Sequence, residues 1–330
     1  MTTSPTHGKQ HERNISLESI LAARERVYQA AVRTPLVRLY YHDAPGEIYL
    51  KLESFQPIGS FKLRGAHNAI SLLSAADKAR GVWTVSAGNA AQGVALSAKI
   101  LGIRCGVLVM DTAPATKIEA IKRLGASITQ APYDECWAAV SEGKHPVFQG
   151  VFIHPFDDDN FIAGNATVGL EILEDLPDVT SVVAAFGGGG LSCGIASVTA
   201  AMRPDVKVYA AEPETASPLQ FSFEKGSAQK FPDWKSSWVD GSGGKSVLPG
   251  MWDLSRRLLA GSIVVTLEEA RRAMSIVAAR NHIICEGAAA CAVAAGLSGK
   301  AGSGKIVCVV SGGNIDLSRF SELTATRTGT

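Results

Sequence analysis

The stretch SVVAAFGGGGLSCGIASVTAAM, residues 181–202, carries the strongest structural signal in the chain. A short apolar, β-rich run leads directly into four consecutive glycines, Gly187 to Gly190, and an apolar helical pattern follows from about Leu191. Successive glycines let backbone N–H groups converge on one point, and the N-terminus of the following helix adds positive potential. This strand–loop–helix unit predicts an α/β fold with a site for a phosphate monoester or a pyrophosphate. A turn without function is the alternative interpretation.

The glycine spacing does not match the common nucleotide-binding motifs. A GxGxxG fingerprint within the run would need a further glycine where Ser192 or Cys193 stands. The run GKAGSGKI, residues 299–306, resembles a Walker loop, but it ends in Ile306 where Mg²⁺ binding requires Ser or Thr. The sequence therefore gives little support for nucleotide binding.

Short β-rich runs alternate with helical patterns along nearly the whole chain, which indicates parallel strands in βαβ units. The runs are EIYLKLE (47–53), GVWTVSA (81–87), CGVLVM (105–110), SITQA (127–131), VFIHP (151–155), SVVAAF (181–186), KVYAAEP (207–213), SIVVTL (262–267) and KIVCVVSGG (305–313). The interval 225–250, rich in Gly, Ser, Lys and Pro, is predicted to be a long loop, and loops of that length in compact chains are usually functional or mobile.

Composition excludes several classes of protein. The 330 residues allow about two domains, and 46% hydrophobic with 19% charged residues indicates a soluble globular protein. A net charge of +1 provides no basic field for nucleic acid, and no apolar run reaches the roughly 18 residues that a membrane span needs. Residues 1–15 lack the apolar core of a signal peptide and are expected to form a disordered tail. Six scattered cysteines without a CxxC pair favour a reduced, cytoplasmic protein.

Lys62 stands in an unusual place within ESFQPIGSFKLRGAHNAI, residues 53–70. Ser60 suits a helix N-cap, so Lys62 falls in the first helical turn, where the helix dipole disfavours a cation. An ordinary lysine reaching into solvent is one interpretation. The other is a lysine kept partly neutral by burial and by the helix end, ready to form a Schiff base.

Three further loops are expected at strand ends: SAGNAAQG (86–93), DGSGG (240–244) and SGGN (311–314). In open parallel sheets ligands collect at the carboxyl ends of the strands, and these loops offer donors without charge. Together with the glycine run and Lys62, they predict a site for a small polar cofactor that carries a carbonyl group and a phosphate.

Seven motifs in one order resemble the pyridoxal-phosphate enzymes of fold type II, specifically the branch of serine/threonine dehydratases (ammonia-lyases) and serine racemases. The motifs are TPL (34–36), GSFKLRGA (59–66), SAGNAAQGVA (86–95), HPFDD (154–158), AFGGGGLSCG (185–194), AEPETA (211–216) and SGGNIDL (311–317). The resemblance runs from about Leu17 to Phe320. It implies a tryptophan-synthase-β-like α/β fold with two open, twisted, largely parallel sheets and helices on both faces. It also implies a large cofactor domain, residues 16–75 and 157–330, and a small mobile domain, residues 76–156.

The resemblance assigns roles residue by residue. Lys62 matches the Schiff-base lysine, Phe61 packs beside the ring, and Asn89 hydrogen-bonds the 3-hydroxyl. Gly187, Gly188, Gly189, Gly190 and Leu191 cradle the phosphate, and Ser311 faces the pyridine nitrogen. The substrate carboxylate is expected on Ser86, Gly88, Asn89, Ala90 and Gln92.

The implied activity is α,β-elimination, which converts a β-hydroxy-α-amino acid such as L-threonine or L-serine to a 2-oxo acid and ammonia. Ser311 supports this, because a neutral hydroxyl keeps the ring nitrogen poorly protonated and favours prompt loss of a β-substituent over transamination. Ala87 stands where the racemase has its second catalytic serine, which argues against racemisation. Ala90 and the GNAT sequence at 164–167 depart from the family pattern near the substrate, so serine, threonine, 3-hydroxyaspartate and phenylserine all stay open.

Three other functions stay open from the sequence: an amino-acid racemase, a β-replacement synthase and a non-catalytic metabolite-binding protein. Glu212 and Ala216 match the family's cation loop, but Pro218 replaces its aspartate, so both a Mg²⁺ ion and an empty site are compatible with the sequence. The expected partners are a small amino-acid substrate and a second copy of the chain in a homodimer, with neither nucleic acid nor membrane.

Overall fold

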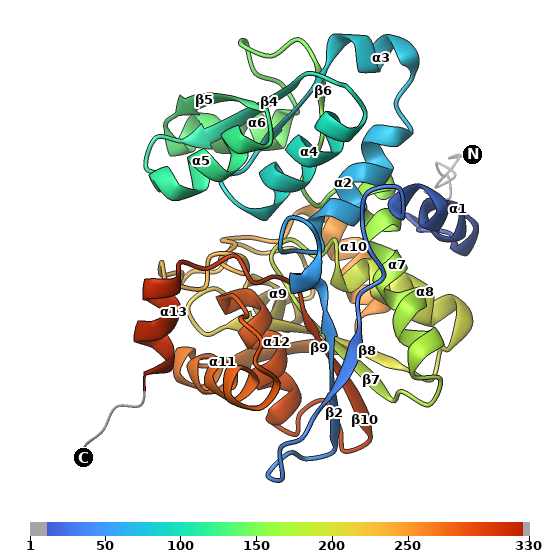
Figure 1. Ribbon diagram of the computed structural model, residues 1–330. Helices are drawn as coiled ribbons and strands as arrows, with labels where there is room; N and C mark the ends of the chain where they lie inside the picture. Colours follow the sequence, from blue (N-terminus) through green and yellow to red (C-terminus); the bar gives the residue numbers. More distant parts are fainter. Residues whose placement is uncertain (1–11, 326–330) are drawn as a thin grey trace, which may run out of the picture.

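The structure is a computed structural model that describes residues 12–325. A six-stranded sheet forms its larger lobe (Figure 1). Its strand order is β1-β2-β10-β7-β8-β9, and every neighbouring pair is parallel except β1 with β2. The strands are β1 Leu36–Leu39, β2 Glu47–Leu52, β7 Ser181–Ala185, β8 Lys207–Pro213, β9 Gly261–Val265 and β10 Lys305–Val310.

A four-stranded, fully parallel sheet forms the smaller lobe, at the top of Figure 1. Its order is β5-β4-β3-β6, with β3 Val82–Val85, β4 Cys105–Met110, β5 Ser127–Ala131 and β6 Val151–Phe152. The helices of this lobe are α3 Ala75–Arg80, α4 Asn89–Ile100, α5 Ala115–Arg123 and α6 Tyr133–Glu142. The predicted α/β class with two largely parallel sheets is confirmed.

Helices cover both faces of the large sheet because its strands are apolar on both sides. Val182 and Ala184 of β7 join one buried cluster, whereas the intervening Val183 joins the other, as the two-residue period of a strand requires. The first cluster includes side chains of α1 Leu17–Val27, α7 Asp159–Asp175, α8 Ser192–Met202, α9 Pro218–Lys225 and α10 Pro249–Leu258. The second includes side chains of α11 Leu267–Asn281, α12 Gly287–Leu297 and α13 Leu317–Thr324.

Helix α2, Lys62–Ser71, lies where the two lobes meet (Figure 1). It follows the single turn η1, Glu53–Phe55, and packs against both α4 and α7. Gly93 of α4 permits this approach, since a Cβ there would stand 2.9 Å from the Lys62 carbonyl oxygen. The first turn of α2 is therefore in contact with both lobes.

Fully buried charges hold α2 against the large lobe. Arg64 donates to Glu53 at 2.8 Å and to Glu171 of α7 at 2.6 Å, and Lys51 of β2 lies 2.6 Å from the same Glu171 carboxylate. Each of these side chains is at most 1% exposed. Buried charges require such partners, so this cluster fixes the backbone two residues beyond Lys62.

The predicted tail over residues 1–15 does not extend to its last residues. Arg13 forms ion pairs with Asp157 and Asp159, and Ile15 is 3% exposed. These contacts explain the difference, because a paired and packed segment has lost its conformational freedom. Residues 1–11 lie outside the described part of the chain. Within residues 12–325, no helix is long and apolar enough to cross a membrane.

Candidate active site

Lys62 begins α2, and its side chain is directed into protein instead of solvent. The Nζ atom donates to the backbone carbonyl of Pro155 at 2.5 Å and lies 5.2 and 5.4 Å from the ring centroids of Phe61 and Phe161. Burial lowers the pKa of Lys62 to about 8, while the charge of Glu286 acts in the opposite direction. Among the two interpretations from the sequence, the buried, partly neutral lysine fits the structure.

The glycine run lies between β7 and α8, as predicted. Within residues 12–325, the backbone N–H groups from Gly187 to Ser192 donate to no recorded acceptor, and Leu191 at the N-cap provides no capping side chain. Other helices, such as α7 with Asp158 at its N-cap, satisfy these donors through a side chain. An uncapped 11-residue helix that follows four glycines is a ready site for a phosphate.

Neighbouring segments leave no room for a side chain at Gly187 or Gly188, and one of these segments leads to the partner of Lys62. A Cβ on Gly188 would meet the Phe156 ring at 2.5 Å, and one on Gly187 would meet the Gly241 carbonyl at 2.3 Å. Phe156 directly follows Pro155, the partner of the Lys62 amine. The glycine run therefore packs against both the HPFDD motif and the DGSGG loop.

A second uncapped helix N-terminus belongs to the loop predicted to hold the substrate carboxylate. Helix α4 begins at Asn89 after Gly88, which provides no capping side chain. Gly88 N donates to Ser86 Oγ at 3.0 Å, and Ala90 and Gln92 lie in the first turn. Within the described chain, the N–H groups of Asn89 and Ala90 have no recorded acceptor, so they are free to bind an anion.

The SGGN loop pairs with the backbone around Lys62. Phe61 N donates to the Ser311 carbonyl at 3.0 Å, and Ser60 bridges to Gly312. Ser311 is buried beside Phe61. The structure therefore brings Ser311 next to the adjacent residues Phe61 and Lys62, which stand far from it in the sequence.

Glu286 was not predicted from the sequence, and Asn314 of the predicted SGGN loop had been given no individual role. Glu286, fully buried before α12, accepts from Asn89 Nδ2 at 2.8 Å, and burial raises its pKa to about 7. Asn314 Nδ2 donates to Asn89 Oδ1 at 2.7 Å. The available signal for Glu286 was a lone carboxylate within the apolar run IICEGAAACA, since a buried charge needs partners.

The long loop predicted at 225–250 spans residues 226–248 in the structure and contacts the small lobe. Lys117 of α5 pairs with Asp240 of the loop. Lys245 Nζ lies 4.2 Å from the ring centroid of Tyr133, at the start of α6, and 4.3 Å from that of Trp234. Two attractive contacts therefore join the two lobes beside the DGSGG segment.

The predicted cation loop is not supported. Both Glu212 oxygens accept hydrogen bonds, from Leu219 N and Gln220 N at 2.8 Å and from Ser262 Oγ at 2.6 Å. The carboxylate therefore satisfies the N-terminus of α9, and burial raises its pKa to about 7. Ala216 is buried and brings no charge. The described residues contain no group of three or more His, Cys, Asp or Glu side chains placed to hold a metal.

Taken together, the fold and the site define a class of α/β proteins with a buried lysine whose neighbours contact both the glycine run before the uncapped α8 and the uncapped helix α4. A pyridoxal phosphate fits these groups: the unpaired N–H groups of the glycine run suit its phosphate, and the Lys62 amine suits its aldehyde. The N-terminus of α4 leaves a separate position for a carboxylate.

Comparison with known proteins agrees with this class. A family model described as pyridoxal-phosphate dependent enzyme matches residues 27–312. The chain is 37% identical over 314 residues to L-threonine ammonia-lyase of Thermotoga maritima, covering 94% of this chain and 78% of that protein. It is 37% identical over 321 residues to the catabolic L-threonine dehydratase TdcB of Escherichia coli K12, covering 94% and 96%. The structure of maize serine racemase matches with a TM-score of 0.87 and 32% identity, covering 93% and 96%.

The chain therefore belongs to the family of pyridoxal-phosphate-dependent enzymes, in the branch of serine/threonine dehydratases and serine racemases. It is a pyridoxal-phosphate-dependent lyase.

Proposed function

We propose that this enzyme converts a β-hydroxy-α-amino acid of the L-threonine or L-serine type to a 2-oxo acid and ammonia. The observation that carries the proposal is the buried Lys62 amine on the Pro155 carbonyl, next to Phe156 against the glycine run before α8, with α4 packed on the Lys62 backbone through Gly93. The N-terminus of α8 suits the cofactor phosphate, and the N-terminus of α4 suits the substrate carboxylate. The relatives named as threonine ammonia-lyase and threonine dehydratase support the same reaction.

Bound pyridoxal phosphate would supply an aldehyde that links to amino groups and a ring that withdraws electrons from the substrate Cα. Lys62 would hold the cofactor through its ε-amine. Once that amine is released by the substrate amino group, it would take the Cα proton, and its lowered pKa suits this role near neutral pH. The substrate then loses its β-hydroxyl as water, and hydrolysis gives the 2-oxo acid and ammonia.

The other residues would position and tune these two groups. The N–H groups of Gly187 to Leu191 would bind the phosphate, with Phe61 beside the ring and Asn89 at its 3-hydroxyl. Ser311 would face the ring nitrogen as a neutral partner, which favours elimination. The loop of Ser86, Gly88, Asn89, Ala90 and Gln92 would hold the substrate carboxylate.

A substrate panel tests the proposal. L-serine, L-threonine, 3-hydroxyaspartate and phenylserine are incubated with the holoenzyme, and 2-oxo acid is measured for each. Adding sulfide or a thiol reveals a β-replacement synthase, which would form a new amino acid in place of ammonia. A protein that binds the cofactor but forms no 2-oxo acid from any of the four would contradict the proposal and favour a non-catalytic binding function.

Racemisation is the second candidate, favoured by the likeness to maize serine racemase. Against it stands Ala87, which has no group that can exchange a proton and packs with the core of the small lobe. Chiral chromatography of L-serine after incubation separates the two reactions. D-serine formed in amounts similar to pyruvate would support the racemase.

We further propose that the small domain, residues 76–156, closes over the substrate. The pair of Lys117 with Asp240, and the contacts of Lys245 with Tyr133 and Trp234, would favour the closed arrangement. Lys245→Met keeps the stem of the side chain but removes the cation, and it is expected to raise KM more than it lowers kcat. An unchanged KM would contradict this closure.

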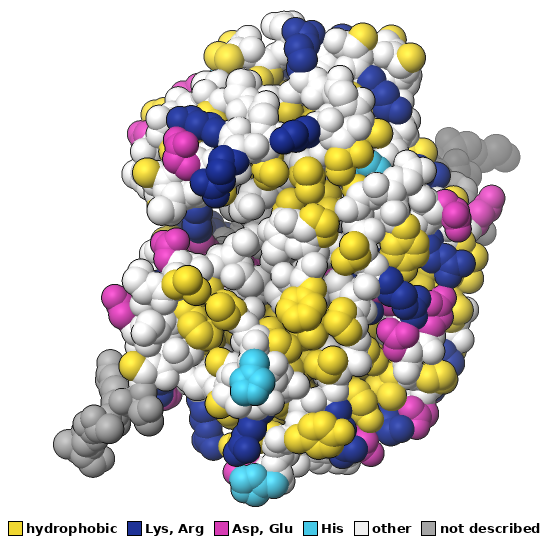
Figure 2. Space-filling view, viewed as in Figure 1, with side chains coloured by type: hydrophobic (Ala, Val, Ile, Leu, Met, Phe, Trp, Pro, Cys, Tyr) yellow, Lys and Arg dark blue, Asp and Glu magenta, His cyan; other side chains and the backbone are white. Residues whose placement is uncertain are grey.

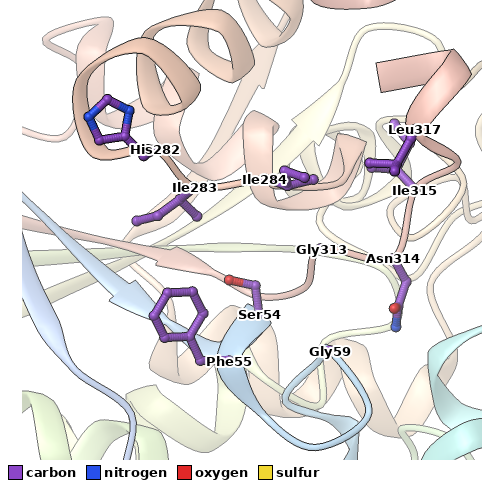
Figure 3. Close-up of a pocket in the computed structure, with 10 residues that line it drawn as sticks. All are labelled: Ser54, Phe55, Gly59, His282, Ile283, Ile284, Gly313, Asn314, Ile315 and Leu317. Atoms are coloured by element: carbon purple, nitrogen blue, oxygen red, sulfur yellow. The ribbon is translucent and has the colours of Figure 1, made fainter. Parts of the chain in front are cut away.

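A homodimer is proposed from the apolar surface of the large lobe (Figure 2). Phe55, Ile284 and Leu317 are 54%, 40% and 68% exposed and line the groove shown in Figure 3. Burying such a surface against a second copy is favourable. Leu317→Asp is expected to shift the mass measured by light scattering toward the monomer. Tyr40→Asp, outside the groove, is the matched control.

We also propose that this protein works in the cytoplasm. Its support is that all six cysteines are free thiols, five of them buried and Cys105 partly buried. A chain that worked in an oxidising compartment would more often pair its cysteines.

A further inference from the structure

We propose that Glu286 and Asn314 are positioning residues that together fix the orientation of the Asn89 side-chain amide, leaving one of its N–H groups for the cofactor. The inference rests on the proposed placement of the cofactor beside Lys62 and Asn89. It concerns how this chain orients the amide, which the proposed reaction leaves open.

The hydrogen bonds around Asn89 define the orientation completely. An amide has one oxygen and two N–H donors. Asn89 Oδ1 accepts from Asn314 Nδ2 at 2.7 Å, and Asn89 Nδ2 donates to Glu286 Oε1 at 2.8 Å. One N–H group of Asn89 is then left without a recorded partner among the described residues. That donor is the one available to an oxygen of the cofactor.

The opposite orientation of the amide is unfavourable at both ends. Rotation would place Asn89 Oδ1 against Oε1 of the ionised Glu286 carboxylate, so that two acceptors face each other. It would also place Asn89 Nδ2 against Asn314 Nδ2, so that two donors face each other. Amide orientation follows from such networks, and here both partners select the same one.

The two partners are themselves held in place. Asn314 Nδ2 also donates to the Ile58 carbonyl at 2.7 Å, which commits both of its N–H groups. A Cβ on Gly59 would stand 2.7 Å from Asn314 Oδ1, and the φ of +71° at Gly59 suits glycine. Figure 3 shows Asn314 and Gly59 next to each other. Asn314 therefore has little freedom to turn away from Asn89.

Glu286 is fixed from the other side. Its backbone N–H donates to the Gly312 carbonyl at 3.0 Å, and a Cβ on Gly312 would stand 2.6 Å from Glu286 Oε1. Glycine at this position leaves room for the carboxylate next to the SGGN loop. The same loop therefore positions Ser311, Asn314 and, through Gly312, Glu286.

The experiment compares bound cofactor in four variants: Glu286→Gln, Asn314→Ala, Asn89→Ala and the double variant Asn89→Ala/Glu286→Gln. The readouts are the absorbance spectrum of the holoenzyme, the dissociation constant of pyridoxal phosphate and the thermal unfolding temperature. Glu286→Gln retains the shape of the side chain but can donate an N–H to Asn89 Oδ1, so position 286 no longer selects one orientation of the amide. Glu322→Gln, on the exposed part of α13, makes the same chemical change elsewhere.

Glu286→Gln and Asn314→Ala are each expected to shift the spectrum and to weaken cofactor binding by up to about tenfold, the loss of roughly one hydrogen bond. In the Asn89→Ala background, measured at a pH well above the pKa of Lys62 so that the Glu286 charge no longer acts through that amine, Glu286→Gln should then have no further effect on spectrum or affinity. An effect of Glu286→Gln that is the same with and without Asn89 would overturn the inference, as would a wild-type spectrum in both single variants. If Asn89→Ala itself left the spectrum and affinity unchanged, the proposed cofactor placement would fail as well, so the two failures are distinguishable.

Discussion

The Nζ atom of Lys62 lies 2.5 Å from the backbone carbonyl oxygen of Pro155. A carbonyl dipole holds the amine in place but cannot balance a full positive charge as a carboxylate would. The Lys62 side chain is also buried against the Phe61 and Phe161 rings. This contact therefore orients the amine while leaving it easy to deprotonate.

The first prediction concerns the pH dependence of cofactor loading. Only a neutral amine attacks an aldehyde, so the rate of pyridoxal phosphate incorporation into the cofactor-free enzyme should rise as pH increases through about 8. An ordinary lysine would place this midpoint near its usual pKa of about 10.4. Stopped-flow absorbance at about 410–430 nm measures the rate. Because the Glu286 charge raises the pKa of Lys62, Glu286→Gln should move the midpoint to lower pH. A midpoint near 10 in the unmodified protein would show that Lys62 is not the reacting amine.

The second prediction concerns Ser311. Ser311→Asp would place a carboxylate at the ring nitrogen, favour its protonation and stabilise negative charge on the substrate Cα. We expect a substrate-dependent absorbance band at long wavelength to accumulate and net elimination to slow. Ser311→Ala, which removes the hydroxyl without adding charge, is the control. If the Asp and Ala variants share the spectrum of the unmodified enzyme, Ser311 does not face the ring.

The third prediction concerns Ala87 and the face of proton transfer. With Lys62 on one side and no acid at Ala87, Cα can be reprotonated only from the side where the proton left. Ala87→Ser adds a hydroxyl that can donate and accept, and it should raise D-serine formation relative to pyruvate release. The gain is expected to be small, since Ala90 removes a neighbour that could tune the serine. No change in the ratio would show that this loop does not face the substrate.

The fourth prediction concerns the buried charges below α2. Glu171→Leu would leave Arg64 and Lys51 without part of their compensation, which should lower the free energy of unfolding by about 3–5 kcal/mol. Glu174→Leu, one turn further along α7, breaks only partly exposed pairs and should cost at most about 1 kcal/mol. Denaturant unfolding of both variants measures the difference. Equal losses would indicate that the buried cluster contributes no more than a surface pair.

Much of both sheets could be predicted because their strands are short runs rich in apolar and β-branched residues that alternate with helical patterns. The runs at 105–110 and 127–131 match β4 and β5 residue for residue. Strand β1, Leu36–Leu39, was not predicted, because it has only four residues and one of them, Arg38, is exposed. Its pairing with β2 at the edge of the sheet makes it a strand, and that contact is not encoded locally.

The site likewise contains residues that the sequence predicts and residues that it does not. Lys62 and the glycine run could be predicted because each is locally unfavourable. Lys62 is a cation at a helix start, where the helix dipole disfavours it, and four successive glycines lose much conformational entropy on folding. Glu286 and the role of Asn314 within the predicted SGGN loop were missed, because both depend on contacts that form only where α4 meets the large lobe. The cation loop is not supported, because a matching Glu212 in the sequence does not reveal that the backbone N–H groups of α9 already occupy its oxygens.

The central claim, that Lys62 carries the cofactor, is tested most directly by borohydride reduction of the holoenzyme followed by peptide mass spectrometry. We expect the reduced cofactor on the peptide that contains Lys62, and we expect Lys62→Ala to lose this adduct. The same variant should keep its fold and lose elimination by at least about 10²–10⁴-fold, the contribution of a general base. A reduced cofactor on another lysine, or full turnover in Lys62→Ala, would contradict the claim.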